Sequence, residues 1–233
     1  MPVALGPAMS QSTTVEPPRI TTFQHRFIPA ERPTGRLAVV LHGLGDSLAG
    51  FTWMPEIMGL PWLNYLLLNA PFPYFFFGYA WFDLEDPAPG VAYSRQQLQA
   101  LFAELKEQGW HSEDILLFGF SQGCLVSLDF AMRYDEPLAG IVGISGYVLM
   151  PEQPEVEIHA RAREQAWLVT HGLYDDLLPV QRTHEQIQRL QAAGLPIEWY
   201  EFPKEHSIDP DDEIPLLRRW IAARWNEPAD GGE

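Results

Sequence analysis

The sequence predicts a three-layer α/β sandwich, in which a mostly parallel central sheet carries helices on both faces. Two observations predict this fold class. Short apolar runs recur along the chain with turn residues nearby, as expected of strands that are buried on both faces of a parallel sheet. Helical patterns lie between these runs, and strands that alternate with helices are joined by right-handed crossovers. The five runs are 37–41, 65–68, 115–118, 141–144 and 167–170.

Four segments between or after these strands have the apolar pattern of helices. Residues 122–133 are apolar nearly all round, which suits a helix packed centrally against the sheet. The other three helices are defined by Leu98, Leu101, Phe102 and Leu105 before a C-capping Gly109, by Val180, Ile187 and Leu190, and by Ile214, Leu217 and Ile221. Residues 197–202, IEWYEF, alternate between apolar and polar and predict a strand nearer the edge of the sheet.

The length of 233 residues is enough for one substantial domain, and the 46% hydrophobic content supplies a large core. We place no boundary within this domain. The first 20 residues contain several prolines and lack a basic region before an apolar run, so they predict a disordered leader rather than a signal peptide. The expected organisation is a leader over 1–20, one α/β domain over 21–225 and a flexible acidic tail over 226–233.

The charge and the cysteine content restrict the partners and the compartment. A formal net charge of −16 repels phosphate backbones and anionic lipid surfaces, which argues against nucleic-acid binding. No stretch of about 18 uninterrupted apolar residues exists, so no segment is expected to span a membrane. The one cysteine, Cys124, excludes an intramolecular disulfide and fits a reducing cytoplasm, which is the expected location.

Residues 119–123, GFSQG, form a G-x-S-x-G motif between an expected strand and an expected helix. A serine on such a sharp turn is held in a strained conformation with its hydroxyl exposed above the sheet. Side chains at Gly119 and Gly123 would collide as strand and helix pack around the turn. The helix that follows points its amide groups and the positive end of its dipole at developing negative charge. Ser121 is therefore the candidate nucleophile.

A serine hydroxyl needs a base, which is itself oriented by a carboxylate. In this fold the order along the chain is serine, acid, histidine, and both partners lie in loops at the carboxyl ends of strands. His206 alone follows a strand end and precedes a helix, in FPKEHSID, and is the candidate base. The other histidines either precede the serine or have surface, packing or turn-supporting positions: His25, His42, His111, His159, His171 and His184.

The candidate acids follow the strand 167–170 in the sequence THGLYDDLLP. Asp175 and Asp176 are adjacent, so only one of them can face the serine, and loop position alone leaves the choice between them open. Three later acidic residues are expected to cap and charge the start of the last helix instead: Asp209, Asp211 and Asp212.

Four separated blocks of the chain resemble the phospholipase/carboxylesterase family of α/β-hydrolases, which includes the acyl-protein thioesterases and small bacterial carboxylesterases. The blocks are LHGLGDS (41–47), WFD (81–83), GFSQG (119–123) and HGLYDDLLP (171–179), with HSI (206–208) near the end. The resemblance implies an α/β-hydrolase fold, and a core of 233 residues leaves no room for a separate lid domain. It also implies that the triad acid is Asp175, the fifth residue of the fourth block, and that the backbone amides of Leu44 and Gln122 form the oxyanion hole.

The loop at residues 71–82, PFPYFFFGYAWF, is unusually aromatic and follows the carboxyl end of a strand, so it belongs at the site face. Three interpretations of its rings stay open: core packing, the walls of an apolar acyl or alcohol pocket, or an exposed patch that touches lipid or a second subunit. As pocket walls, the substrate-binding residues are Phe75, Phe76, Phe77 and Trp81, together with Leu178. Cys124 is expected to be a small packing residue, with a redox-sensitive thiol as the alternative.

These inferences predict a serine carboxylesterase that hydrolyses short- to medium-chain carboxylic esters through an acyl-enzyme intermediate, with no metal and no cofactor. A short pocket walled by large rings predicts an optimum near butyryl or hexanoyl esters. An acyl-protein thioesterase or lysophospholipase that acts on longer acyl chains is the alternative among enzymes. A non-catalytic binding protein on a hydrolase scaffold is the alternative from another class, because fold alone does not give function. The expected partner is a small-molecule ester, and the resemblance adds a homodimer as a further expectation.

Overall fold

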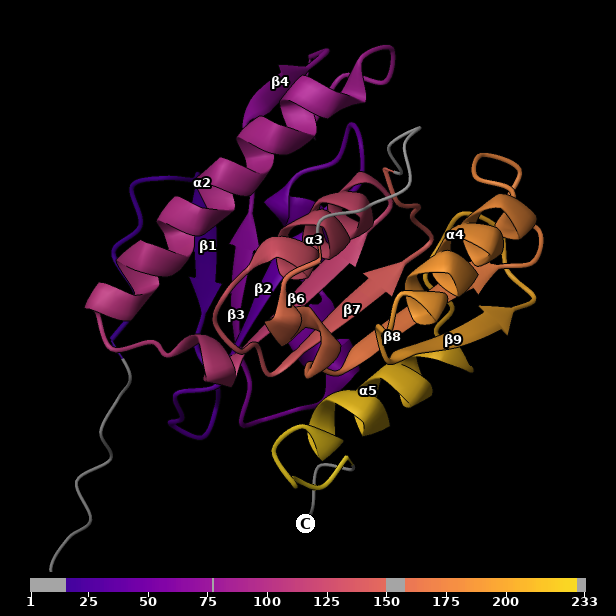
Figure 1. Ribbon diagram of the computed structural model, residues 1–233. Helices are drawn as coiled ribbons and strands as arrows, with labels where there is room; N and C mark the ends of the chain where they lie inside the picture. Colours follow the sequence, from indigo (N-terminus) through magenta and orange to yellow (C-terminus); the bar gives the residue numbers. More distant parts are fainter. Residues whose placement is uncertain (1–15, 77, 150–157, 230–233) are drawn as a thin grey trace, which may run out of the picture.

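The computed structural model describes residues 16–76, 78–149 and 158–229. Its centre is a seven-stranded sheet with the strand order β1-β3-β2-β6-β7-β8-β9 (Figure 1). All neighbouring strands run parallel except the edge strand β1, which pairs antiparallel with β3. The strands are β1 His25–Ile28, β2 Leu37–Leu41, β3 Asn64–Leu68, β6 Ile115–Phe120, β7 Gly140–Ile144, β8 Trp167–Gly172 and β9 Ile197–Phe202.

Each of the six strands predicted from the sequence is present in this sheet. Five of them lie in its interior with almost all their residues buried, which explains their near-continuous apolar sequences. The sixth, β9, lies at the second edge, as its alternating sequence predicts. The sequence pattern missed β1, whose sequence HRFI is half polar, and a separate two-stranded hairpin of β4 Phe72–Tyr74 and β5 Gly78–Ala80.

Helices cover both faces of the sheet and give the three layers that the sequence predicts (Figure 1). They are α1 Met54–Met58, α2 Pro87–Glu107, α3 Gln122–Arg133, α4 Val180–Ala192 and α5 Glu213–Ala223, with 3₁₀ segments at Leu48–Phe51, Ser112–Asp114 and Ala160–Arg163. On one face, α2, α3 and α4 pack in a buried cluster that includes Leu37, Val39 and Leu41 of β2. On the other face, α1 and α5 pack with Ala38 and Val40. Successive residues of β2 therefore contact opposite layers.

The four helices expected from the sequence correspond to α2, α3, α4 and α5. The bounds of α3 are those predicted. α2 begins at Pro87, well before Leu98, which is the first apolar position of the predicted pattern. Proline is tolerated there because it lies in the first turn of the helix. Gly109 follows the end of α2 with φ +86°, the left-handed conformation of a C-capping glycine. Among the described residues, no helix is long and apolar enough to cross a membrane.

The predicted leader and tail lie partly outside the described residues, at 1–15 and 230–233. The described end of the leader lies along α2, where the backbone amide of Arg19 donates a hydrogen bond to Oε1 of Gln108 at 2.7 Å. In the described part of the tail, Glu227 forms an ion pair with Arg36. Described residues on both sides of 21–225 therefore contact the domain.

Candidate active site

Ser121 lies at the turn between β6 and α3, where the sequence motif places it. Its backbone has φ +56° and ψ −115°, a conformation that residues with a side chain rarely adopt. The amide of Ser121 donates a hydrogen bond to the carbonyl of Ile144 at the end of β7, at 2.9 Å. This bond fixes the strained turn against the sheet, while the serine itself stays partly exposed.

Close packing requires glycine at both motif positions. A Cβ on Gly119 would overlap the carbonyl of Gly123 and would lie 2.5 Å from Oγ of Ser127. A Cβ on Gly123 would overlap the carbonyl of Leu41 at the end of β2. Because neither glycine carries a side chain, α3 can begin directly against the carboxyl ends of the central strands.

The fold brings His206 and Asp175 to Ser121. Nε2 of His206 lies 2.9 Å from Oγ of Ser121, and Nδ1 lies 2.7 Å from Oδ2 of Asp175. Asp175 is in the loop after β8 and His206 is in the loop after β9, both at the carboxyl ends of their strands. The other oxygen of Asp175 accepts hydrogen bonds from the amides of Leu177 and Leu178, at 3.1 and 2.8 Å. The carboxylate is therefore held at both of its oxygens.

Burial distinguishes the two adjacent aspartates. The side chain of Asp175 is fully buried beside His206, whereas Asp176 is exposed, so only Asp175 reaches the histidine. His171, at the end of β8, supports this loop: its Nε2 donates a hydrogen bond to the carbonyl of Leu178 at 2.7 Å. Burial lowers the pKa of His171, which favours the neutral ring. The turn-supporting role expected of this histidine agrees with these contacts.

The HGLG turn after β2 lies against the serine, because a Cβ on Gly43 would come within 3.3 Å of Cβ of Ser121. His42 fixes this turn. Its Nδ1 donates to the carbonyl of Gly43 at 2.6 Å, and its Nε2 accepts from the amide of Ala70 at 3.1 Å. One ring nitrogen donates and the other accepts, so His42 is neutral, and burial lowers its pKa. Within the described ranges, the backbone amide of Leu44 in this turn has no hydrogen-bond acceptor.

The side chain of Gln122 is bound by the segment that follows the β4–β5 hairpin. Its Oε1 accepts from the amide of Trp81 at 2.9 Å, and its Nε2 donates to the carbonyl of Phe82 at 3.0 Å. The indole Nε1 of Trp81 donates to the carbonyl of His42 at 2.8 Å. These three hydrogen bonds connect the start of α3 to the HGLG turn, which carries Leu44. They fix the relative positions of the two residues whose amides are the candidate oxyanion hole.

The β4–β5 hairpin is attached to the same turn. The amide of Gly45 donates to the carbonyl of Tyr79, and the amide of Tyr79 donates to the carbonyl of Asp46, both at 2.9 Å. A Cβ on Gly78 would overlap the carbonyl of Gly45, so the two backbones are in direct contact. The hairpin is therefore fixed against the HGLG turn, which itself lies against the serine.

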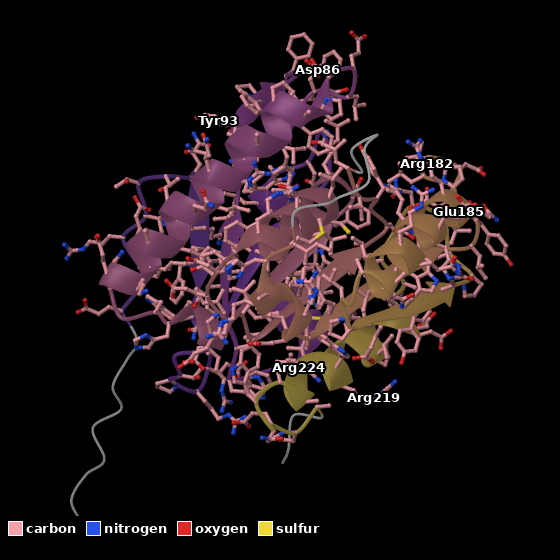
Figure 2. All side chains as sticks on the ribbon, viewed as in Figure 1. Asp86, Tyr93, Arg182, Glu185, Arg219 and Arg224 are labelled. Carbon is pink, nitrogen blue, oxygen red and sulfur yellow. The ribbon has the colours of Figure 1, made fainter. Side chains whose placement is uncertain are left out.

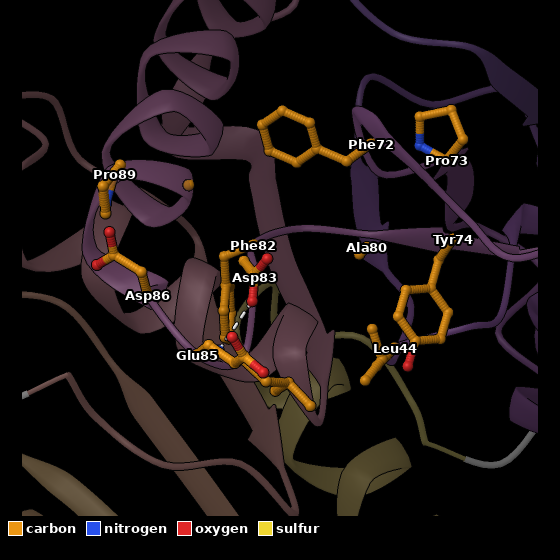
Figure 3. A pocket seen from close by; sticks show the side chains of 12 residues that line it. Leu44, Phe72, Pro73, Tyr74, Ala80, Phe82, Asp83, Glu85, Asp86 and Pro89 are labelled. Carbon is orange, nitrogen blue, oxygen red and sulfur yellow. Dashed lines mark hydrogen bonds between the residues drawn. The ribbon is translucent and has the colours of Figure 1, made fainter.

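A cavity of about 780 Å³ lies between this hairpin, the HGLG turn and the start of α2. In Figure 3, Leu44, Tyr74 and Ala80 lie on one side of it, and Asp86 and Pro89 lie on the other. The lining is apolar beside Leu44 and carries carboxylates toward α2. The full lining is Leu44, Phe72, Pro73, Tyr74, Ala80, Phe82, Asp83, Leu84, Glu85, Asp86, Pro89 and Gly90.

The acidic part of this cavity lies at one end of the molecule. Figure 2 shows Asp86 and Tyr93 at the start of α2, whereas Arg219 and Arg224 of α5 lie at the opposite end. The carboxylates of the cavity are exposed and distant from these two arginines.

The aromatic residues expected to wall the pocket lie elsewhere. Trp81 is 0% exposed and belongs to the core cluster, so its ring does not reach the cavity. Phe75 and Phe76, at the tip of the hairpin, are 83% and 90% exposed. Phe77 lies outside the described residues. Leu178 lines a separate cavity of about 290 Å³.

Strand geometry explains this difference between the expected and the observed pocket. All three residues of β4, Phe72, Pro73 and Tyr74, line the cavity, while the turn that follows carries Phe75 into solvent. After β5, Trp81 turns inward to bond the main chain of His42. Large rings thus do line the cavity, but they are different members of the same aromatic segment.

Neither a reactive thiol nor a metal site occurs among the residues that the structure describes. Cys124 is fully buried in α3, and a Cβ on Gly143 would lie 2.7 Å from its Sγ. Burial raises the pKa of the Cys124 thiol to about 12, so it packs as a small apolar group. Across the described ranges, no three His, Cys, Asp or Glu side chains gather closely enough to hold a metal ion.

A strained serine at a strand–helix turn, bonded to a histidine from a later loop, is the arrangement of the α/β-hydrolases. A chain with this fold and this site is an enzyme of the serine hydrolase class. Comparison with protein families narrows the class of this enzyme further: the family model described as Phospholipase/Carboxylesterase matches residues 24–221 of the chain. The chain belongs to this family, as its sequence blocks predict.

Individual relatives include both thioesterases and esterases. Acyl-protein thioesterase 1 of Schizosaccharomyces pombe is 30% identical over 154 residues, which cover 60% of this chain and 69% of the relative. Acyl-protein thioesterase 1 homolog 1 of Dictyostelium discoideum is 27% identical over 221 residues, 87% of this chain and 96% of the relative. The crystal structure of esterase PE8 superposes with a TM-score of 0.76 at 26% identity, over 87% of this chain and 99% of the other. These relatives are consistent with an enzyme that hydrolyses esters.

Proposed function

We propose that the chain is a carboxylesterase that hydrolyses short- to medium-chain carboxylic esters through an acyl-enzyme intermediate. The observation that carries this proposal is the continuous chain of hydrogen bonds from Ser121 through His206 to Asp175. A hydroxyl within bonding distance of a histidine, which is itself oriented by a buried carboxylate, is what activation of a serine nucleophile requires.

In the first half of the reaction, Oγ of Ser121 attacks the ester carbonyl carbon while Nε2 of His206 accepts the hydroxyl proton. Asp175 keeps the protonated Nδ1 of His206 toward itself and stabilises the imidazolium. The amides of Leu44 and Gln122 donate hydrogen bonds to the oxyanion. The C–O bond then breaks, and the alcohol leaves with the proton from His206. Water attacks the acyl-enzyme by the same steps, which releases the carboxylic acid and restores Ser121.

The lining of the cavity supports a limited acyl length. Each methylene that is buried against the apolar side, near Leu44 and Tyr74, contributes about 0.8 kcal/mol to binding. Further along, the cavity is lined by Asp83, Glu85 and Asp86, and burying methylenes there would remove water from carboxylates. The gain per methylene is therefore expected to end where these carboxylates begin.

An acyl-protein thioesterase acting on longer chains is the second candidate, and a lysophospholipase belongs to the same alternative. The names of the Schizosaccharomyces pombe and Dictyostelium discoideum relatives favour it. The same triad attacks a thioester by the same steps, with a thiol as the leaving group in place of the alcohol.

A series of p-nitrophenyl esters from acetyl to palmitoyl, together with a palmitoyl thioester, tests the proposal. We expect kcat/KM to rise to about butyryl or hexanoyl and to fall for chains of about ten carbons or more. Best activity on palmitoyl substrates would favour the thioesterase candidate instead. The Ser121→Ala variant should lose about 10⁴-fold or more in kcat. If a fluorophosphonate fails to label wild-type Ser121, the chain is a binding protein on a hydrolase scaffold.

A further inference from the structure

Lys204 and Glu213 form a buried ion pair beside the loop that carries His206. Nζ of Lys204 lies 2.7 and 2.6 Å from the two carboxylate oxygens of Glu213, and the two side chains are only 3% and 0% exposed. Burial lowers the pKa of Lys204, and the charge of Glu213 opposes that shift. Removing two charges from water costs about as much as their attraction returns, so stability alone does not account for such a pair.

The polar groups of this pair are fully used. Besides Glu213, Nζ of Lys204 donates to the carbonyl of Ser207 at 2.7 Å. Oε1 of Glu213 accepts from the hydroxyl of Thr170 at 2.5 Å, and Oε2 accepts from the amide of Asp209 at 2.9 Å. A buried network in which every member is satisfied has one preferred geometry, because any displacement leaves a buried polar group without a partner.

Two of these bonds hold the main chain on the C-terminal side of the base. Ser207 directly follows His206, and its carbonyl is fixed by Lys204, which precedes the histidine by two residues. The amide of Asp209, three residues after His206, is fixed by Glu213 at the start of α5. The loop is therefore attached on both sides of the histidine to the same ion pair.

The same two residues also contact the segment that carries the acid, through the backbone of Lys204 and the side chain of Glu213. The carbonyl of Lys204 accepts a hydrogen bond from the amide of Tyr174, the residue before Asp175, at 3.0 Å. Thr170 lies near the end of β8, from which the Asp175 loop departs, and its hydroxyl is bound by Glu213. One buried network thus connects the backbone segments that present the acid and the base.

We propose that Lys204 and Glu213 are positioning residues, which hold His206 at the distances from Ser121 and Asp175 that proton transfer requires. The pair contacts no substrate and acts only through the two loops. The inference rests on the proposed role of these three residues in ester hydrolysis. A base displaced by about 1 Å can cost up to about 100-fold in rate, so a network that restricts the loop has a direct catalytic effect.

Four variants test this inference: Lys204→Met, Glu213→Gln, the double variant Lys204→Met/Glu213→Leu, and Asp129→Asn as a control. Lys204→Met and Glu213→Gln should each lower kcat about 10- to 100-fold, with KM within about twofold of wild type. Both should also lower the melting temperature, because each leaves one buried group without its partner. The double variant has no buried charge, so its melting temperature should exceed those of Lys204→Met and Glu213→Gln while its kcat stays low.

The control separates stability from catalysis. The carboxylate of Asp129 is also buried and paired, with Arg95 and Arg133, but it lies within α3 away from the reacting groups. Asp129→Asn should lower the melting temperature and leave kcat unchanged. If the double variant regains kcat together with its melting temperature, or if kcat follows stability in all variants, the pair serves stability alone and the inference is overturned.

Two further measurements keep the inference testable. The rate of fluorophosphonate labelling needs only the nucleophile and its base, so it should fall in the single variants even if no tested ester is a good substrate; equal labelling rates would overturn the inference. Should the single variants not fold, Thr170→Val removes only one hydroxyl from the network. It should lower kcat at least about threefold, and an unchanged kcat would count against the network.

Discussion

The indole nitrogen of Trp81 donates a hydrogen bond to the main-chain carbonyl of His42, at 2.8 Å. The amide of the same tryptophan donates to the side chain of Gln122, so one residue connects both segments of the candidate oxyanion hole. Its ring is buried in the core rather than exposed to the cavity. Trp81 therefore lies in the core as a link between these two segments, where the sequence predicts a pocket wall.

Replacement of Trp81 by phenylalanine keeps a large buried ring and removes the bond to His42. We expect kcat on the best ester to fall about 10-fold, because the HGLG turn is no longer fixed relative to Gln122. The acyl chain length with the highest kcat/KM should stay the same. If the optimum shifts toward longer chains, Trp81 is part of the pocket wall, and its position in the core is contradicted.

Asp175 and Asp176 offer a matched pair of substitutions. Asp175→Asn should lower kcat by about 10³-fold or more, because an amide neither fixes the tautomer of His206 nor stabilises its imidazolium. Asp176→Asn should stay within about twofold of wild type, since Asp176 is exposed. Kinetics on a butyryl ester check both values, and a similar loss in the two variants would show that the Asp175 contact is not the catalytic one.

Gly119 and Gly35 test the packing around the nucleophile turn. A Cβ on Gly119 would overlap the carbonyl of Gly123, whereas a Cβ on Gly35 would have nothing within 4 Å. Gly119→Ala should lower the free energy of unfolding by about 3 kcal/mol, and Gly35→Ala should change it by less than about 0.5 kcal/mol. Urea unfolding measures both. Equal stabilities of the two variants would mean that the turn accommodates a side chain.

Two buried histidines make stability depend on pH. Burial lowers the pKa of His42 and His171 from the ordinary value of 6.5. Below pH 6.5 the unfolded chain binds protons at these positions that the folded chain does not, so the free energy of unfolding falls as the pH falls. The slope is up to about 1.4 kcal/mol per pH unit for each histidine.

His171→Gln removes one of these two groups. Between about pH 6.5 and 5.5, His42 and His171 both contribute to the change of the free energy of unfolding with pH. The variant should lose about half of this contribution. Urea unfolding at pH 7.5, 6.5 and 5.5 gives the slope. The absolute stability of the variant is not the test, because the bond to Leu178 is lost as well. A slope equal to that of wild type would mean that His171 binds a proton as readily in the folded chain as in the unfolded chain.

The sheet could be predicted where strands have five or six residues and a regular pattern of burial. The runs at 37–41 and 197–202 match β2 and β9 at both ends, because burial on two faces or on one leaves a clear sequence pattern. The hairpin at 72–80 could not be predicted in this way. Its strands have three residues each and one contains Pro73, so their pairing depends on contacts with the HGLG turn.

The candidate triad could be predicted because its members have local signatures and a fixed order along the chain. The pocket could not, because the direction of each ring in 71–82 depends on where the hairpin packs. Lys204 was missed, although a signal was present: it is one of only two lysines in the chain and lies two residues before His206. Its partner Glu213 is nine residues away in sequence, and only the fold shows that the two meet.

Ser121 and His206 are 85 residues apart in the sequence, and β7, β8 and β9 are added to the sheet between them. A ribosome releases the chain from its N-terminal end, so the nucleophile and the HGLG turn emerge well before the base. The contact between Ser121 and His206 therefore forms only when β8 and β9 are part of the sheet. A chain truncated after β7 is therefore expected to lack ester hydrolysis even where its first strands fold, because the base is missing.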